Sequence, residues 1–250
     1  MKFYAIITAG GSGQRMKSSL PKQFHLLERA QFDKENNILN IDKYPILYWT
    51  IEKFLSTPLD IEIILVLPKE WIATWQEFFM KNNFDFHHTI VEGGISRFHS
   101  VKAALQKVPD NVVVAVHDGV RPLVSAKLIT DLYSQNFNGE FAGVVPYINT
   151  FDSVREITNI QTEEIISSKY IKREKYIQIQ TPQVFSSNVL KEAYSHPFST
   201  DFTDDASVVE SRGYKVKLVP GERLNLKITT EEDKKAAQTI LNGLSFSELK

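Results

Sequence analysis

Short continuous runs of apolar residues alternate along the chain with segments in which apolar residues recur at helical spacing. The runs at Phe3–Thr8, Ile61–Leu67 and residues 112–116 are rich in β-branched side chains. Such strands are typical of a sheet covered on both faces. Because helical segments separate them, the pattern predicts an α/β fold with a mostly parallel sheet and helices on both faces.

Four amphipathic helices are predicted, each marked at its start by a residue that commonly begins helices: Pro45, Ser96, Ser125 and Thr230. The first presents an apolar face made of Leu47, Ile51, Phe54 and Leu55. In the last, Asp233 stands at the third helical position, where a carboxylate completes a capping box.

Two stretches interrupt this alternation. Residues 26–43 are polar and form a long excursion before the first helix. Residues 147–180 are mixed, with weak strand signals at Ile165 and Ile166 and at residues 176–179. A structureless loop of that length is uncommon in a compact domain. We therefore expect a single domain over residues 1–250 with a β-arm at about 147–180.

Composition excludes several classes of protein. The net charge is −1, so no global basic field gathers nucleic acid or an anionic membrane surface. Without cysteine there are no disulfides, thiolate metal sites or cysteine nucleophiles, which suits a reducing compartment. The apolar runs are too short to span a bilayer, and the first residues lack a signal peptide. We expect a soluble cytoplasmic protein.

The first candidate site follows the first strand. Three glycines (Gly10, Gly11 and Gly13) precede Arg15, and Lys22 follows shortly after. Glycines at a strand end let backbone N–H groups approach phosphate oxygens. A nicotinamide-cofactor fingerprint fails because Met16 stands where its third glycine belongs, and the P-loop ending is absent. The pattern favours a triphosphate held by two cations; the alternative is a tight turn with incidental surface charges.

A second glycine pair lies between a strand and a helix. Gly93 and Gly94 precede Ser96, and Ser100 follows one helical turn later. Backbone groups there suit a flat polar ligand such as a base, with Ser100 near the base or its ribose. A plain turn with Ser96 as the helix cap explains the segment equally well.

The third candidate site ends a buried strand, where open α/β sheets place their ligands. Asp118 would hold Mg²⁺ or bind substrate hydroxyls, and Arg121 would neutralise it or bind phosphate. The alternative is a structural Asp–Arg pair that fixes the turn. We expect His117 to be a packed histidine rather than a catalyst, since the six histidines show no metal-ligand spacing.

Three further segments follow downstream: residues 180–185, 202–207 and 224–229. Thr203 with the two aspartates after it makes a good helix N-terminus, and Gly213 would end that helix. Lys227 is expected in a short alternating strand, where an exposed lysine needs no function.

Taken in order, seven motifs resemble one family over nearly the whole chain. They are Ala-Gly-Gly-x-Gly-x-Arg-Met, Pro-Lys-Gln, Gly-Gly-x-x-Arg-x-x-Ser-Val, His-Asp-x-x-Arg-Pro, Thr-Pro-Gln-x-Phe, Thr-Asp-Asp-Ala-Ser and Asn-x-Lys-Ile-Thr. The family is the 2-C-methyl-D-erythritol 4-phosphate cytidylyltransferases of the non-mevalonate isoprenoid pathway. Ribitol 5-phosphate cytidylyltransferases share most of the motifs, and a non-catalytic nucleotide-binding regulator is a further alternative. Lys17, Asn149 and the length of residues 26–43 depart from the pattern.

The resemblance implies a Rossmann-like nucleotidyltransferase fold, a homodimer and Mg²⁺-dependent transfer from CTP. By resemblance, CTP would be bound by Ala9, Gly10, Gly11, Gly13, Gly94, Ser100 and Gly119. The polyol phosphate would be bound by Asp118, Arg121, Thr150, Thr181, Thr203 and Lys227. The catalytic residues would be Arg15, Lys22, Lys227 and Arg173. Of these, Arg15 and Lys22 would grip the triphosphate, and Arg173 would reach the substrate from the arm of the second subunit.

Overall fold

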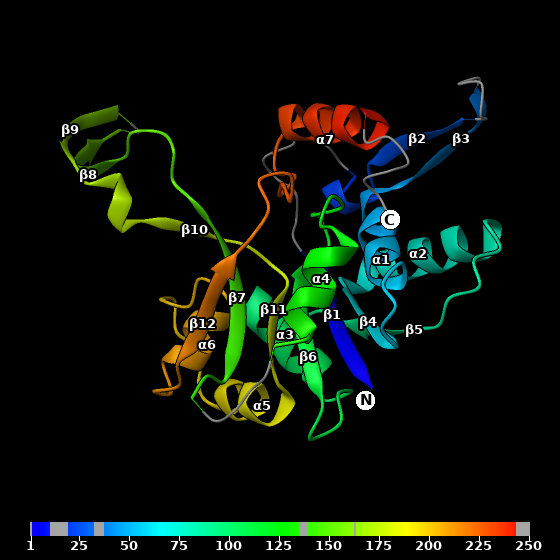
Figure 1. Cartoon of the computed structure of the whole chain (residues 1–250), viewed down its shortest axis with the longest axis horizontal. Coiled ribbons are helices and arrows are strands. Elements are labelled where there is room, and N and C mark those ends of the chain that lie inside the picture. Colours follow the sequence, from blue (N-terminus) through cyan, green and yellow to red (C-terminus); the bar gives the residue numbers. More distant parts are fainter. Residues whose placement is uncertain (1, 11–19, 33–37, 136–139, 163, 244–250) are drawn as a thin grey trace.

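A central sheet organises the part of the chain that the computed structural model describes, which is residues 2–10, 20–32, 38–135, 140–162 and 164–243. Its strand order is β10-β7-β11-β6-β1-β4-β5, with β12 beside β7 (Figure 1). The strands are β1 (Phe3–Thr8), β4 (Ile61–Leu67), β5 (His88–Glu92), β6 (Val113–Asp118), β7 (Gly143–Asn149), β10 (Ile177–Ile179), β11 (Gln183–Ser186) and β12 (Val216–Pro220).

The sheet is mostly parallel, as predicted. β6, β1, β4 and β5 run parallel to one another, as does β12 to β7, whereas β10 and β11 are antiparallel to the strands beside them. β1 and β4 have the predicted bounds, and β6 extends to Asp118. In the register, Thr8 of β1 lies opposite Asp118 of β6. The carboxyl ends of these two strands therefore meet at one edge, where this class of sheet binds ligands.

Helices cover both faces of the sheet. On one face lie α1 (Ile46–Leu55), α2 (Lys69–Lys81) and α4 (Ala126–Tyr133), which pack on β1 and β4 through a shared core. On the other lie α3 (Arg97–Leu105), α5 (Ser187–Ser195) and α6 (Asp205–Glu210). Of the helices in the described residues, none has the length and apolarity needed to cross a membrane.

The predicted helix starts are confirmed. The side chains of Ser96 and Ser125 each accept a hydrogen bond from a backbone N–H in the first turn of α3 and α4. In α7 (Glu231–Gly243), Thr230 Oγ1 accepts from the Asp233 N–H, and the Asp233 carboxylate accepts from the Thr230 N–H. Leu55 does not belong to the buried face of α1, since it is 40% exposed.

Of two expectations about the downstream segments, the helix at residues 203–205 is confirmed and the strand at Lys227 is wrong. The helix expected at Thr203 and the two aspartates is present, with Asp204 as its N-cap and a capping box between Asp204 and Ser207. Gly213 follows this helix with φ +82°, as suits a stop signal. Lys227 is not in a strand. The segment around it is irregular, and its backbone bonds to the turn after β6: the Ile228 N–H donates to the Val120 carbonyl at 2.9 Å.

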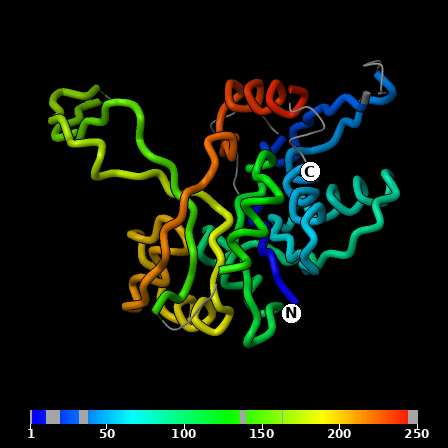
Figure 2. The backbone as a smooth tube through the Cα atoms, in the orientation of Figure 1, coloured from blue at the N-terminus to red at the C-terminus, as the bar shows by residue number. Residues whose placement is uncertain are grey.

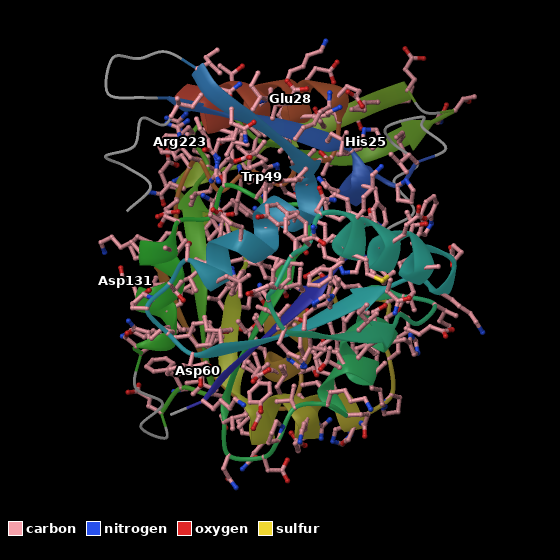
Figure 3. All side chains as sticks on the ribbon, turned by 90° about the vertical axis from the view of Figure 1, so that its right-hand side faces the viewer. His25, Glu28, Trp49, Asp60, Asp131 and Arg223 are labelled. Carbon is pink, nitrogen blue, oxygen red and sulfur yellow. The ribbon has the colours of Figure 1, made fainter. Side chains whose placement is uncertain are left out.

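The polar excursion at residues 26–43 is an antiparallel hairpin, which the sequence did not indicate. β2 (Leu26–Phe32) pairs with β3 (Ile38–Pro45), and Leu27 lies opposite Tyr44. Leu27 is fully buried in a core that it shares with Trp49 of α1 and with α7. In Figure 3, Trp49 lies beneath the hairpin, and Glu28 lies on it next to α7. The missed strands are thus held by residues distant in sequence.

A second hairpin projects from the opposite side of the molecule. β7 and β10 lie in the central sheet, and between them the chain runs out to β8 (Arg155–Gln161) and β9 (Glu164–Tyr170) before the short helix η3 (Arg173–Lys175) (Figures 1 and 2). The weak signal at Ile165 and Ile166 lies in β9, but β8 gave none. The assignment of this arm to dimerisation stays a prediction.

Candidate active site

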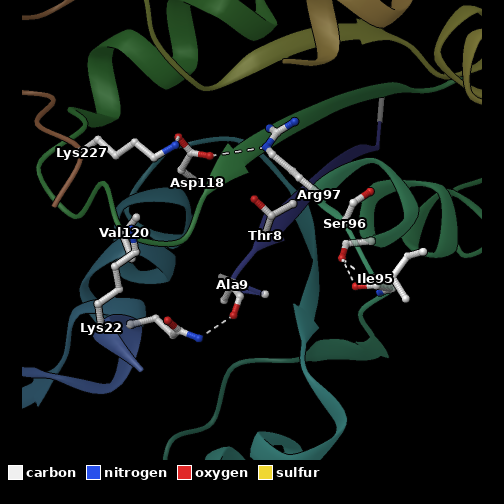
Figure 4. Close-up of a pocket in the computed structure, with 13 residues that line it drawn as sticks. Thr8, Ala9, Lys22, Ile95, Ser96, Arg97, Asp118, Val120 and Lys227 are labelled. Atoms are coloured by element: carbon white, nitrogen blue, oxygen red, sulfur yellow. Dashed lines mark hydrogen bonds and ion pairs between the residues drawn. The ribbon is translucent and has the colours of Figure 1, made fainter. Parts of the chain in front are cut away.

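A pocket of about 400 Å³ opens at the carboxyl edge of β1 and β6 (Figure 4). It is lined by residues from the end of β1, the short helix η2 (Lys22–Phe24), the turn before α3 and the end of β6. These are Thr8, Ala9, Gly10, Lys22, Gln23, Gly94, Ile95, Ser96, Arg97, Ser100, Asp118, Val120 and Lys227. Described residues of all three candidate sites thus meet in one cavity: Gly10 and Lys22 of the first, Gly94 and Ser100 of the second, and Asp118 of the third.

The first wall of the pocket joins β1 to η2. The Ala9 N–H donates to the Val66 carbonyl at 3.0 Å, and the Ala9 carbonyl accepts from Gln23 Nε2 at 2.6 Å. Gln23 is fully buried, so it fixes the helix that carries Lys22 against the end of the strand. Gly11, Gly13, Arg15 and Lys17 lie outside the described residues.

The opposite wall is the turn before α3. Ser100 Oγ accepts a hydrogen bond from the Gly94 N–H at 3.1 Å and so braces the turn internally. A Cβ atom on Gly94 would stand 2.4 Å from Cβ of His99, so glycine is required there. Both interpretations of this segment therefore apply: it is a capped turn, and it lines the pocket. The contact of Ser100 with a ribose stays a prediction.

Asp118 lies at the centre of a cluster of positive charges. Its carboxylate is 3.1 Å from Arg121 Nε, 3.1 Å from Lys227 Nζ and 3.7 Å from Arg97 Nε. Arg97 and Lys227 approach it from opposite sides in Figure 4. Burial by itself would raise the pKa of Asp118, but the charges of these three cations outweigh it and hold the pKa well below its ordinary value.

Asp118 is therefore an anion at neutral pH, and it orients cations instead of transferring protons. The structural Asp118–Arg121 pair considered as an alternative is present. Arg121 also donates from Nη1 to the Asn225 carbonyl at 2.8 Å, which ties the turn after β6 to the segment that carries Lys227. The pair thus helps to place Lys227 beside Asp118.

His117 is packed and neutral, as expected. It is fully buried, and burial lowers its pKa to about 3. The Asp118 N–H donates to Thr181 Oγ1 at 3.1 Å, and the Thr181 hydroxyl lies 3.0 Å from His117 Nδ1. His117 Nε2 lies 3.3 Å from the Arg121 carbonyl. A neutral imidazole satisfies both ring contacts, by accepting at Nδ1 and donating at Nε2.

A second pocket, of about 250 Å³, adjoins the first and shares three of its residues, Arg97, Asp118 and Lys227. It brings together five of the residues expected to bind the polyol phosphate: Asp118, Arg121, Thr181, Thr203 and Lys227. Two adjoining cavities with a cationic cluster at their junction suit two phosphorylated substrates.

Of the expected residues that the structure describes, three do not line these two pockets. Gly119 donates its N–H to the Thr8 carbonyl at 2.9 Å and is packed against Leu47, where a Cβ atom would come within 3.0 Å of Cδ1. Thr150 follows the end of β7. Arg173 lies in η3 on the arm, about half exposed, and donates from Nη1 to the Phe151 carbonyl.

Sequence reasoning missed Arg97 as a site residue. Its guanidinium makes two hydrogen bonds with the carboxylate of Asp205, from Nη1 at 2.9 Å and from Nη2 at 2.6 Å. The signal was available, because Arg97 is the arginine of the Gly-Gly-x-x-Arg motif. Its position at a helix start concealed that it faces the cavity.

Comparison with known proteins decides the family. A model of the 2-C-methyl-D-erythritol 4-phosphate cytidylyltransferase family matches residues 3–243. The chain belongs to this family. The enzyme of that name from Bacteroides fragilis is 42% identical over 95% of this chain and 98% of its own length. The one from Porphyromonas gingivalis is 40% identical over 97% and 99%.

Solved structures agree with the family assignment. The cytidylyltransferase of Francisella tularensis superposes with a TM-score of 0.70 at 26% identity, over 95% of this chain and 98% of that one. The chain also matches 54% of a bifunctional protein from Campylobacter jejuni, with 94% of its own length covered, a TM-score of 0.68 and 25% identity. The expected Rossmann-like cytidylyltransferase fold is confirmed.

Proposed function

We propose that this cytidylyltransferase converts CTP and 2-C-methyl-D-erythritol 4-phosphate to 4-diphosphocytidyl-2-C-methyl-D-erythritol and pyrophosphate. The observation that carries the proposal is the pair of adjoining pockets with Arg97, Asp118 and Lys227 at their junction. The names of the relatives support this substrate over ribitol 5-phosphate, whose enzymes share most of the motifs.

The reaction needs no general base. A phosphate oxygen of the polyol substrate is already ionised at neutral pH, so it attacks the α-phosphorus of CTP directly. One P–O bond forms there, the bond to the β-phosphate breaks, and pyrophosphate leaves with the negative charge. The task of the protein is to position the two substrates and to neutralise charge. Asp118 and His117 suit this mechanism, since neither is poised to exchange a proton near pH 7.

Lys22 and Arg15 would meet the charge that develops on pyrophosphate, and Lys227 would meet the incoming phosphate. Ala9, Gly10, Gly11, Gly13, Gly94, Ser100 and Gly119 would surround the cytidine, with backbone groups matching the edge of the base. Asp118, Arg121, Thr150, Thr181 and Thr203 would face the polyol phosphate. For Lys22, Gly10 and Gly94 the support is their place in the pocket wall.

A divalent cation is proposed as part of the substrate. Among the described residues, no group of three or more acidic, histidine or cysteine side chains is arranged to hold a metal. Of the described residues that line the first pocket, Asp118 is the single one with a carboxylate. One protein carboxylate suits Mg²⁺, which commonly takes most of its ligands from water and substrate phosphates. The ion would neutralise phosphate charge, with Asp118 as its one protein ligand.

We also propose a homodimer in which the arm completes the neighbouring active site. Arg173 lies on the arm, outside the lining of both pockets of its own chain. The arm exposes apolar side chains, with Ile160 opposite Ile165 and each more than half exposed. Surface of this kind is typical of a protein interface. A cytoplasmic location is proposed because both substrates are highly charged and the sequence has no cysteine, which suits a reducing compartment.

The test is pyrophosphate release with CTP against a panel of polyol phosphates. We expect the highest kcat/KM with 2-C-methyl-D-erythritol 4-phosphate and Mg²⁺. Lys22→Ala should lower kcat by about 100-fold, more than it raises KM for CTP. Lys127→Ala is the matched control, since Lys127 is an exposed lysine of α4 paired with Asp131. A higher kcat/KM for ribitol 5-phosphate would overturn the substrate, and CTP binding without turnover would indicate a regulator.

A further inference from the structure

Arg97 occupies the junction of the two pockets. It is the first residue of α3, and it lines both cavities together with Asp118 and Lys227. If one pocket holds CTP and the other the polyol phosphate, the α-phosphorus reacts where the two cavities meet. The inference below therefore rests on the proposed function.

Asp118 is not the residue that fixes the Arg97 guanidinium. Its carboxylate is 3.7 Å from Arg97 Nε, beyond hydrogen-bond distance, and it already contacts Arg121 and Lys227 at 3.1 Å. The close partner is Asp205, whose two carboxylate oxygens take up Nη1 and Nη2 at 2.9 and 2.6 Å. A two-point contact of this kind defines the plane of the guanidinium as well as its position.

Asp205 is itself held rigidly. It is fully buried, and the hydroxyl of Tyr194, which is 2% exposed, donates to Asp205 Oδ1 at 2.7 Å. The start of α6 is anchored to β11, because Gln183 Oε1 accepts from the Ala206 N–H at 2.8 Å. The N-cap of α6 is Asp204, so capping does not require the Asp205 side chain.

A buried carboxylate is costly unless it is paired, and a buried ion pair adds little to the stability of the fold by itself. The Arg97–Asp205 pair instead joins a buried anion to a cation whose side chain remains 31% exposed in the pockets. Because Asp205 takes up Nη1 and Nη2, the Arg97 Nε is left 3.7 Å from the Asp118 carboxylate, which lines both pockets.

We propose that Asp205, supported by Tyr194, is a positioning residue that holds the Arg97 guanidinium against the phosphate oxygens at the α-phosphorus during transfer. Without Asp205, Arg97 turns to the carboxylate of Asp118 and leaves the transferred phosphate with one cation fewer. The loss then falls on turnover more than on the binding of either substrate.

The experiment is a double-mutant cycle on pyrophosphate release, with kcat and both KM values measured for Asp205→Asn, Arg97→Gln and the charge-balanced double variant. We expect kcat to fall by about 100-fold in Arg97→Gln and by about 10-fold in Asp205→Asn, with each KM changed by less than about 3-fold. In the Arg97→Gln background, Asp205→Asn should lower kcat no further, because its effect passes through Arg97.

Val209→Ala is the structural control. Val209 is a fully buried residue of the same helix, it lies in the core on that face of the sheet, and it lines neither pocket. It should lower Tm while kcat stays unchanged. Tyr194→Phe is a milder probe of the same contact, made in the wild type and in Arg97→Gln. In the wild type we expect it to lower kcat by about 3-fold, and it replaces Asp205→Asn in the cycle if that variant does not fold.

Three results would overturn the positioning role: multiplicative losses in the double variant, an unchanged kcat in Asp205→Asn, or an equal loss of kcat in Val209→Ala. Turnover by the wild-type protein is measured in the same series. If the wild-type protein shows no turnover, the proposed function is wrong. If the wild-type protein turns over normally and the losses of kcat multiply in the double variant, only the role of Asp205 is wrong.

Discussion

The two projecting hairpins of this molecule have the same architecture but very different surroundings. The β2–β3 hairpin is held by Trp49, whose Nε1 donates to the Leu27 and Tyr44 carbonyls at 3.1 Å each. The backbone of β2 is also paired on the side of α7, because Gln238 of α7 accepts a hydrogen bond from the Glu28 N–H and donates one to the Glu28 carbonyl. Both hairpins expose apolar side chains: Ile38, Leu39 and Ile41 on β3, and Ile157, Ile160, Ile165 and Ile166 on the arm, are all more than half exposed. The difference is that Leu27 of β2 is fully buried, whereas no residue of β8 or β9 is buried.

Within the part of the chain that the structure describes, the side-chain hydrogen bonds and ion pairs of β8 and β9 join these two strands to each other. An isolated two-stranded hairpin is marginally stable in water. The β2–β3 hairpin gains its stability from the core of its own protomer. The arm has no such core, and we infer that it gains stability from a second subunit.

The largest effect is expected where the docked hairpin meets the core. Trp49→Ala removes a fully buried indole and both of its hydrogen bonds to the hairpin. We expect a loss of about 3–5 kcal/mol in the free energy of unfolding, measured by urea denaturation. A loss below about 1 kcal/mol would show that the hairpin is held by α7 alone.

On the arm, the largest effect should be on catalysis instead of folding. Arg173→Ala should lower kcat/KM by about 100-fold, because it removes a cation from the neighbouring substrate pocket. The free energy of unfolding should stay the same, since the side chain is about half exposed. Arg155→Ala is the matched control: it removes an arginine from the same arm, and its kcat/KM should stay near that of the wild type.

Mixing two inactive variants tests whether Arg173 acts across the dimer. Arg15→Ala and Arg173→Ala should each be nearly inactive alone. After co-refolding in equal amounts, about half of the dimers contain one of each chain, and each of these has one native site. About a quarter of full activity should therefore return. If mass measurement confirms mixed dimers and no activity returns, Arg173 acts within its own chain and the shared site is wrong.

A smaller effect should follow from the charged residue that covers Trp49. Arg29 lies with its guanidinium 4.5 Å from the centre of the Trp49 ring, and its Nη1 donates to Glu52 at 3.1 Å. Both side chains are about a quarter exposed. Arg29→Ala should cost about 1–2 kcal/mol in unfolding free energy through lost cation–π contact and packing. The same loss in Arg29→Met would show that charge, and not the stem, carries the effect.

The elements that could be predicted from the sequence are those whose determining residues lie within the element itself. β1 and β4 had the expected bounds because strands buried on both faces are continuously apolar. The caps of α3, α4 and α7 were predictable because a cap bonds within its own first turn. In each case the residues that determine the element lie inside it.

The failures depend on partners distant in the chain. β2 was missed because its inward residue Leu27 packs in a core with Trp49 and with α7, and α7 lies about 200 residues further along the chain. Arg97 was missed because its place at a helix start explained it locally, whereas Asp205, the partner that fixes its guanidinium beside the cavity, is 108 positions away. A strand was expected at Lys227 because apolar and polar residues alternate around it. The structure instead has the Ile228 N–H bonded to the Val120 carbonyl in the turn after β6, a contact that the local sequence does not indicate.

The smallest effect should come from an ion pair on the arm. Lys169 Nζ lies 3.0 Å from Glu156 Oε2, much as Arg29 contacts Glu52, but both side chains on the arm are more than half exposed. Water screens such a pair and side-chain entropy opposes it, so Lys169→Ala should change the unfolding free energy by about 0–0.5 kcal/mol. Urea denaturation beside Arg29→Ala gives the comparison directly. Equal losses in the two variants would mean that water does not screen the arm pair in solution, and the contrast between the two ion pairs would fail.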